Sequence, residues 1–260
     1  MDLGLKGKVI IVTGGTKGIG EAISKAIAAE DGIPVFIGRT KDHGEKLLKE
    51  LQNDGKAAYF ISGDLNDVQT CEQIVKEVVE KFGSIYGLVN NAGANDSIGL
   101  ENGSPEKFRK SLNSNLNHYY NMAHFCLESL KKSKGSIVNI SSKTAITGQG
   151  GTSGYAAAKG AQLALTREWA VELLPYGVRV NAVIPAEVMT PLYESWLSSF
   201  KNPEEKRSSI TGKIPLGKRM TTSEEIAASV VFLLSEKSAH TTGQHLVVDG
   251  GYTHLDRSIT

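Results

Sequence analysis

Short runs of apolar, largely β-branched residues alternate along the chain with longer segments whose apolar residues recur at helical spacing. The short runs predict buried strands, and the amphipathic segments predict helices. Ser104-Pro105 is typical of a helix start, an N-cap followed by proline, and the helix after it is expected to run, with a break, to Lys132. We expect strands at 9–13, 34–37, 57–61, 86–90, 136–141, 178–183 and 245–248, and further helices at 20–30, 45–53, 68–82, 155–174 and 223–234.

This alternation predicts an α/β fold. Seven strands with intervening helices favour a parallel sheet covered on both faces, and right-handed crossovers then give a doubly wound sheet. We therefore expect one Rossmann-type domain over residues 1–260, with a seven-stranded parallel sheet. Residues 189–218 interrupt the strand–helix rhythm, and we interpret this polar stretch as a candidate lid over the ligand crevice.

Charge and composition narrow the classes of partner. Lys plus Arg (29) and Asp plus Glu (28) nearly cancel, so the net charge of +1 gives no basic surface for nucleic acid or acidic membranes. No segment approaches the roughly 18 apolar residues of a membrane span, and no signal-peptide core is visible. Cys71 and Cys126 lie in no CxxC motif or metal-binding cluster. We expect free thiols, no bound metal and a cytoplasmic location.

A glycine-rich turn follows the first predicted strand and opens the first predicted helix. It reads Thr13-Gly14-Gly15-Thr16-Lys17-Gly18-Ile19-Gly20, with the spacing G-x-x-x-G-x-G. By itself such a turn is as often structural, but after the first strand of a βαβ series it indicates a dinucleotide site, because a helix N-terminus favours a pyrophosphate. Expected contacts are Gly14, Thr16, Lys17, Gly18, Ile19 and Gly20.

The end of the second predicted strand bears on which dinucleotide binds. It reads Ile37-Gly38-Arg39-Thr40 and has no carboxylate to bind a ribose 2′-hydroxyl. Arg39 can hold a 2′-phosphate with two hydrogen bonds, and Lys17 is a candidate for the same group. The alternative is that both are solvated surface cations. We expect NADP to be preferred, with NAD possible.

Tyr155 and Lys159 form the candidate catalytic pair. They are four residues apart on a predicted helix and therefore share a face. A free tyrosine has a pKa of about 10, and a neighbouring ammonium favours the phenolate and lowers that pKa. Ser142 directly follows the fifth predicted strand, and residues 90–93 lie at the end of the fourth. Both segments are therefore expected at the same edge of the sheet. Asn115, a polar residue within a predicted helix, is a candidate link between Lys159 and water.

These motifs together resemble the short-chain dehydrogenase/reductase family over nearly the whole chain, including Asp64 and the Asp249-Gly250-Gly251 string. The resemblance implies that Tyr155 is the acid/base, that Lys159 lowers its pKa and holds the nicotinamide ribose, and that Ser142 positions the substrate oxygen. It implies that Asn115 anchors a proton relay through water and that Asp64 contacts the adenine. The further implied cofactor contacts are Leu65, Asn91, Ala92, Gly93, Pro185, Val188 and Thr190.

The resemblance also implies a homotetramer in which two long helices pack against those of a neighbouring subunit. In this chain they are the helix ending near Lys132 and the helix at 155–174. The second helix carries an apolar stripe of Leu163, Leu165 and Trp169, which is compatible with helix–helix burial.

The expected substrate pocket is polar. A pocket rich in hydrogen-bonding groups suits a polyhydroxylated ligand, although several of these residues are alternatively exposed loop residues. Where the family usually has glycine this chain has Ala186, and Glu187 follows it; a carboxylate there disfavours an apolar ligand. The candidate substrate contacts are Asn95, Asp96, Lys143, Gln149, Glu187 and Trp196.

Within the family, segments 91–99, 141–154, 180–193 and 250–257 resemble bacterial L-fucose dehydrogenases. The resemblance implies oxidation of the anomeric C1 hydroxyl of L-fucose, or of a related aldose, to the lactone. A carbonyl or 3-oxoacyl reductase would share Tyr155 and Lys159 but has no use for Glu187. A non-catalytic NADP-binding sensor is the remote alternative, because such a protein is expected to have lost Tyr155 or Lys159.

Overall fold

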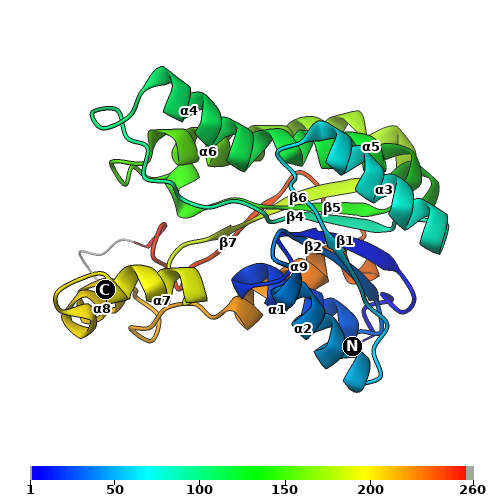
Figure 1. Ribbon diagram of the computed structural model, residues 1–260, viewed down its shortest axis with the longest axis horizontal. Coiled ribbons are helices and arrows are strands. Elements are labelled where there is room, and N and C mark those ends of the chain that lie inside the picture. Colours follow the sequence, from blue (N-terminus) through cyan, green and yellow to red (C-terminus); the bar gives the residue numbers. More distant parts are fainter. Residues whose placement is uncertain (1, 256–260) are drawn as a thin grey trace.

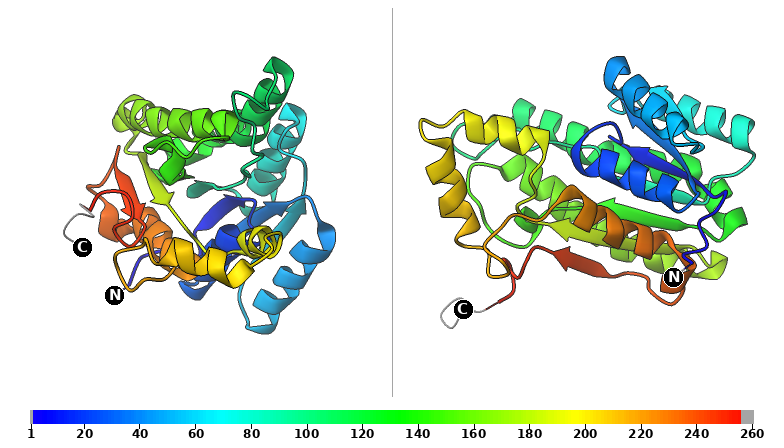
Figure 2. Two further views of the ribbon diagram at one scale, coloured as in Figure 1. Left: turned by 90° about the vertical axis from the view of Figure 1, so that its left-hand side faces the viewer. Right: turned by 90° about the horizontal axis from the view of Figure 1, so that it is seen from below.

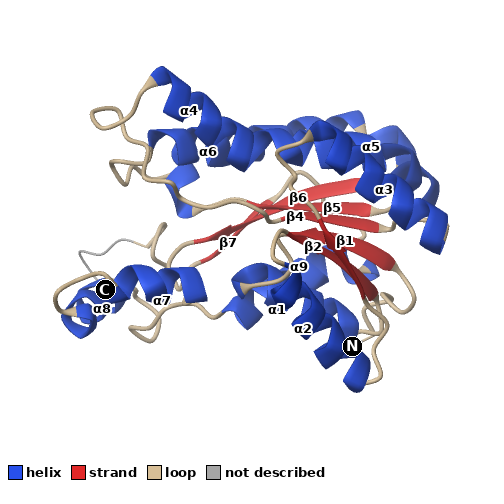
Figure 3. Ribbon diagram, in the orientation of Figure 1, coloured by secondary structure: helices blue, strands red, loops and turns tan. Residues whose placement is uncertain are grey.

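The computed structural model of the chain describes residues 2–255 and contains one parallel sheet of seven strands. The strand order is β3-β2-β1-β4-β5-β6-β7, and every pair of neighbours is parallel (Figure 3). The order reverses direction between β1 and β4, which is the switch point of a doubly wound sheet. The strands are β1 (Val9–Thr13), β2 (Ile33–Gly38), β3 (Tyr59–Ser62), β4 (Gly87–Asn90), β5 (Ser136–Ile140), β6 (Arg179–Pro185) and β7 (His245–Val248).

Helices cover both faces of the sheet, as predicted (Figure 1). One layer contains α1 (Gly18–Ala29), α2 (Lys41–Asn53) and α9 (Ser223–Leu234), and the other contains α3 (Val68–Phe82), α4 (Pro105–Leu112), α5 (His118–Ser133) and α6 (Ser153–Glu172). The short helical turns are η1 (Asn113–Asn117), η2 (Lys143–Ala145), η3 (Leu174–Tyr176) and η4 (Glu236–Ser238).

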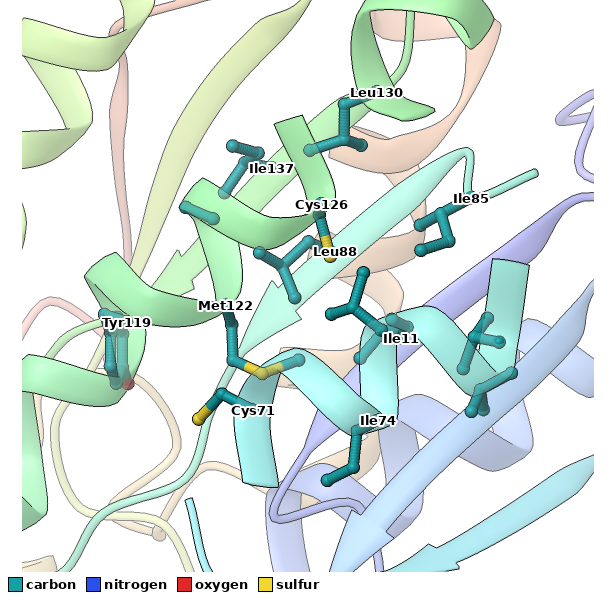
Figure 4. Packing of buried hydrophobic residues seen from close by; sticks show 14 of the residues in the cluster. Ile11, Cys71, Ile74, Ile85, Leu88, Tyr119, Met122, Cys126, Leu130 and Ile137 are labelled. Atoms are coloured by element: carbon teal, nitrogen blue, oxygen red, sulfur yellow. The ribbon is translucent and has the colours of Figure 1, made fainter. Parts of the chain in front are cut away.

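Each face of the sheet has its own apolar core. Under α3 and α5, Leu88 and Ile11 of the sheet pack with Met122 and with both cysteines (Figure 4). Full burial of one such side chain contributes about 1.5–3 kcal/mol. Cys71 and Cys126 are buried free thiols, as the sequence predicts. Burial raises the pKa of the Cys71 thiol to about 11, so it is protonated and unreactive at neutral pH.

The predicted helix start at Ser104 and the predicted break are both confirmed. Ser104 Oγ accepts a hydrogen bond of 3.2 Å from the Lys107 N–H, and Pro105 occupies the first helical turn. The break is a single π-helical turn, η1, between α4 and α5. Such a turn widens the helix by one residue and frees carbonyl groups from the i→i−4 pattern, which is common at functional sites.

Residues 189–218 are more regular than the sequence indicates. They contain two short helices, α7 (Pro191–Ser198) and α8 (Pro203–Thr211), each with a side-chain N-cap and proline at its start. Both lie beyond one end of the sheet (Figure 2). A small core of Leu197, Ile214 and Met220 joins them to Tyr252 in the C-terminal turn. The segment is therefore a regular part of the fold with its own small core, and not a structureless loop.

The C-terminal turn begins at Asp249, whose carboxylate accepts hydrogen bonds of 2.8 Å from the N–H groups of Gly251 and Thr253. The end of the 250–257 segment noted in the sequence lies outside the described residues. Within residues 2–255, no helix is long and apolar enough to cross a membrane, and no group of three or more metal-ligating side chains is present.

Candidate active site

A cleft of about 950 Å³ opens at the carboxyl ends of the strands. Its position follows from the fold, because loops diverge on either side of the switch point between β1 and β4. Every residue that the sequence assigned to catalysis or to the cofactor lines this cleft: Gly14, Thr16, Lys17, Gly18, Ile19, Gly20, Arg39, Asp64, Leu65, Asn91, Ala92, Gly93, Asn115, Ser142, Tyr155, Lys159, Pro185, Val188 and Thr190.

The glycine turn leaves room for a ligand only because its glycines pack backbone against backbone. A Cβ atom on Gly20 would lie 2.2 Å from the Gly14 carbonyl oxygen. Asn91 Nδ2 closes the turn from β4 by donating to the carbonyls of Thr13 and Gly14, at 3.0 and 3.2 Å. The α1 helix starts at Gly18 without a side-chain cap. Its first N–H groups therefore suit a pyrophosphate.

Arg39 and Lys17 line the same cleft beside the turn, and both are exposed. Within the described part of the chain, neither side chain forms an ion pair. Arg39 directly after β2 and Lys17 in the glycine turn are thus cations without an acidic partner among residues 2–255, which fits a dinucleotide that carries a 2′-phosphate.

We expect Arg39→Ala to raise the apparent KM for NADP much more than the KM for NAD, because only NADP offers the phosphate that this guanidinium can hold. Initial rates measured with each cofactor at fixed ionic strength test this. Lys41→Ala, the loss of an exposed cation two residues further on, is the control. An equal effect of Arg39→Ala on both cofactors would show that Arg39 is only a surface charge.

Tyr155 and Lys159 lie on one face of α6, with Lys159 Nζ 5.5 Å from the centre of the Tyr155 ring. Burial raises the pKa of Tyr155 to about 12, and a hydrogen bond with the Ser142 side chain opposes this rise. Burial also lowers the pKa of Lys159 to about 7. The sequence argument expected the Lys159 ammonium to lower the Tyr155 pKa; in the structure the largest influence is the desolvation of the Tyr155 side chain itself, which raises that pKa.

Asn115 lies in the π-helical turn, and both polar atoms of its side chain are hydrogen-bonded. Oδ1 accepts from the Ala94 N–H at 2.8 Å, and Nδ2 donates to the Ser111 carbonyl at 3.1 Å. The main-chain carbonyl oxygen of Asn115 accepts a 2.7 Å hydrogen bond from Gln162 Nε2, and the second lone pair of this oxygen remains for water. Sequence reasoning missed Gln162, although it lies one turn after Lys159 on the same helix face.

The candidate substrate residues divide into three groups. Asn95 and Asp96 are exposed and line the cleft after β4. Lys143 and Glu187 form a salt bridge, with side chains 10% and 12% exposed, and do not line the cleft themselves. Gln149 and Trp196 also do not line it: Gln149 is exposed, and Trp196 is 44% exposed.

Tyr193, a polar residue that the sequence already groups around the expected pocket, connects the buried pair to the cleft. It lies on α7, lines the cleft, and donates a 2.6 Å hydrogen bond to Glu187 Oε2. The other carboxylate oxygen accepts from Lys143, whose Nζ also lies 4.4 Å from the centre of the Tyr252 ring. Residue 143, residues 187–193 and residue 252, which are far apart in the chain, thus meet around the Lys143–Glu187 pair.

An open parallel sheet, a glycine turn at its switch point and a Tyr–Lys pair at the same edge define a dinucleotide-dependent oxidoreductase. A family model described as enoyl-(acyl carrier protein) reductase matches residues 14–253. The chain belongs to the short-chain dehydrogenase/reductase family.

Relatives of known name differ in substrate. L-fucose dehydrogenase of Mus musculus is 38% identical over 246 residues, which cover 94% of this chain and 88% of the relative. The 3-oxoacyl-(acyl-carrier-protein) reductase of Thermotoga maritima is 36% identical over 250 residues, covering 95% and 98%. The crystal structure of Cj0485 dehydrogenase is similar with a TM-score of 0.95 and 54% identity, covering 99% of this chain and 98% of that chain.

Proposed function

We propose that this enzyme oxidises the anomeric C1 hydroxyl of L-fucose, or of a related aldose, to the lactone, with NADP preferred over NAD. The observation that carries the proposal is the Glu187 carboxylate, which Lys143 and Tyr193 hold directly behind the cleft wall formed by its chain neighbours Ala186 and Val188 and by Tyr193 itself. Two of its lone pairs are committed, and a carboxylate has about four. The remaining two suit the paired hydroxyl donors of a pyranose.

The catalytic residues have separate tasks. Ser142 holds the substrate oxygen and Tyr155 accepts the C1 hydroxyl proton, while the Lys159 ammonium stabilises the phenolate. Bound nicotinamide dinucleotide supplies the hydride acceptor. The glycine turn, Asp64 and the Asn91–Gly93 segment would hold it, and Arg39 and Lys17 would hold its 2′-phosphate. Residues 189–218 act as a lid, since Pro191, Leu192 and Tyr193 of α7 line the cleft.

A 3-oxoacyl or other carbonyl reductase is the alternative, and the similarity to the Thermotoga maritima reductase favours it. Against it stands the same Glu187–Lys143 pair, because the carboxylate lone pairs that Lys143 and Tyr193 leave unused would find no hydrogen-bond donor on an acyl chain. The sugar reading therefore fits the polarity of this wall better.

Cofactor absorbance over a panel of L-fucose, L-galactose, D-arabinose, simple ketones and 3-oxoacyl thioesters tests the proposal. We expect reduction of NADP with the sugars and little turnover of the thioesters. Turnover of ketones or thioesters without turnover of any sugar would refute sugar oxidation and support a carbonyl or 3-oxoacyl reductase. No turnover of any compound by a protein that binds NADP would favour the non-catalytic sensor.

We also propose a homotetramer assembled through α5 and α6, with a correction to the residues involved. Leu163 and Trp169 of the predicted stripe are buried within the chain, Leu163 with Ala182 and Ile184 of β6 and Trp169 in the core beneath α5, against which Leu165 also packs. The stripe therefore faces the sheet. The apolar side chains that α5 and α6 leave exposed are Tyr120 (55%) and Val171 (68%).

Sedimentation at micromolar concentration is expected to give a tetramer, and Val171→Glu is expected to shift it toward smaller species because a charge would enter the interface. A stable wild-type monomer would refute the assembly. Val68→Glu, the same change at a 51% exposed valine on α3, is the control that should leave the tetramer intact.

A further inference from the structure

The Lys159 ammonium lies between two tyrosines, of which the sequence identified one. Its Nζ is 5.5 Å from the ring centre of Tyr155 and 5.3 Å from the ring centre of Tyr119. Nζ donates a 3.2 Å hydrogen bond to the Tyr119 hydroxyl oxygen and a 2.7 Å hydrogen bond to the Ile140 carbonyl. Three elements, α5, β5 and α6, thus converge on one cation.

Tyr119 is held rigidly in this position. Its side chain is fully buried in the core beneath α5 (Figure 4), and its hydroxyl donates to the Ile140 carbonyl at 3.0 Å. Gln162, also fully buried, hydrogen-bonds the Tyr119 hydroxyl and donates to the Asn115 carbonyl at 2.7 Å. The side chains of Tyr119 and Gln162 thereby link Lys159 to the main-chain carbonyl of Asn115.

We propose that Tyr119 is a positioning residue for the reaction: it acts through Lys159, keeping the ammonium charged and directed at Tyr155. The proposal rests on the proposed function only in taking Lys159 as the partner of Tyr155. A phenol oxygen that accepts a hydrogen bond from an ammonium favours the charged form of the lysine. Without that acceptor, nothing on Tyr119 offsets the lowering of the Lys159 pKa by burial, and Lys159 loses its proton at a lower pH.

Few other groups influence this charge. The titratable groups facing Lys159 are Tyr155 on its own helix and Tyr119 and His118 on α5, while β5 contributes the Ile140 carbonyl. Burial lowers the pKa of His118 to about 4, and burial raises the pKa of Tyr119 well above its ordinary value. Both are neutral between pH 6 and pH 9. Lys159 has no carboxylate partner among residues 2–255.

The test is Tyr119→Phe, which removes only the hydroxyl, with Tyr120→Phe as the matched control at the neighbouring, 55% exposed tyrosine. The first readout is the titration of the Lys159 side chain by NMR of ¹³C-lysine-labelled protein, assigned by the signal lost in Lys159→Met. We expect the midpoint to fall by about one pH unit in Tyr119→Phe and to stay in place in Tyr120→Phe. An unchanged or higher midpoint overturns the proposal, whatever the substrate proves to be.

The second readout is the pH dependence of kcat/KM with whichever substrate the wild type oxidises. A less charged lysine stabilises the Tyr155 phenolate less, so the loss of kcat/KM in Tyr119→Phe should be largest near neutral pH, where wild-type Lys159 still carries part of its charge, and smallest at high pH, where Lys159 is neutral in both proteins. A loss of equal size at every pH would indicate structural damage and would also overturn the proposal. Absence of any sugar oxidation by the wild type refutes the proposed function and leaves the NMR result to decide on Tyr119.

Discussion

Tyr155→Phe is expected to lower kcat by about 10²- to 10⁴-fold, because the variant lacks the group that accepts the substrate proton. The phenyl ring fills the same volume at a half-buried position, so folding and cofactor binding should change little. The measurement is steady-state turnover together with NADP affinity by fluorescence titration.

Tyr176→Phe is the matched control, since Tyr176 is 45% exposed in the turn after α6. It should retain wild-type turnover. If Tyr155→Phe keeps more than about a tenth of wild-type turnover, another group transfers the proton and the assignment of Tyr155 fails. A loss of NADP binding to the same extent would point to a collapsed site instead.

Glu187→Gln is expected to lower kcat/KM for L-fucose about tenfold or more, since hydrogen bonds to a charged group are each worth about 1.5–3 kcal/mol. The amide keeps the shape and can still accept from Tyr193. It loses the charge that strengthens bonds from sugar hydroxyls and that neutralises Lys143. NADP affinity should change little, because the contacts of Glu187 are to Lys143 and Tyr193.

The control for Glu187→Gln is Glu194→Gln, the same chemical change at an exposed carboxylate on α7. It should leave sugar oxidation unaffected. Thermal unfolding of both variants separates loss of substrate contact from loss of stability, because Lys143 is left without its partner in only one of them. Unchanged sugar oxidation in Glu187→Gln would mean that the carboxylate serves only to hold Lys143 and the C-terminal turn.

The fold could be predicted from sequence to within a few residues at each element. The bounds of β1, α3, α9 and β7 agree with the structure, whereas β3 starts at Tyr59, two residues later than expected. These elements are predictable because burial on both sheet faces gives continuous apolar runs, and burial on one helix face gives a 3.6-residue repeat. The two helices within residues 189–218 were harder to predict. Their N-caps, Thr190 and Asn202, are visible in the sequence, but the helices pack against residues outside the segment, including Met220 and Tyr252.

Much of the candidate site could also be predicted from residues close together in the chain. The glycine turn and the Tyr155–Lys159 pair are each recognisable from spacing within one segment. Ser142 and Asn91 were expected at the same edge because the carboxyl ends of parallel strands meet there. The substrate wall was less predictable. Residue type alone grouped Lys143 and Glu187 with Gln149 and Trp196, but only the first two meet, and the cleft reaches them through Tyr193.

The sequence by itself determined the order of strands and helices, the position of the glycine turn and the candidate catalytic pair Tyr155 and Lys159, because each depends on residues that are neighbours in the chain or on the period of one element. Only the tertiary structure decided which side chains from different elements meet: Tyr119 with Lys159, Gln162 with Asn115, and Lys143 with Glu187. The tertiary structure also decided that the Tyr155 pKa is raised and not lowered. Desolvation depends on everything packed around a group, and no local pattern specifies that surrounding.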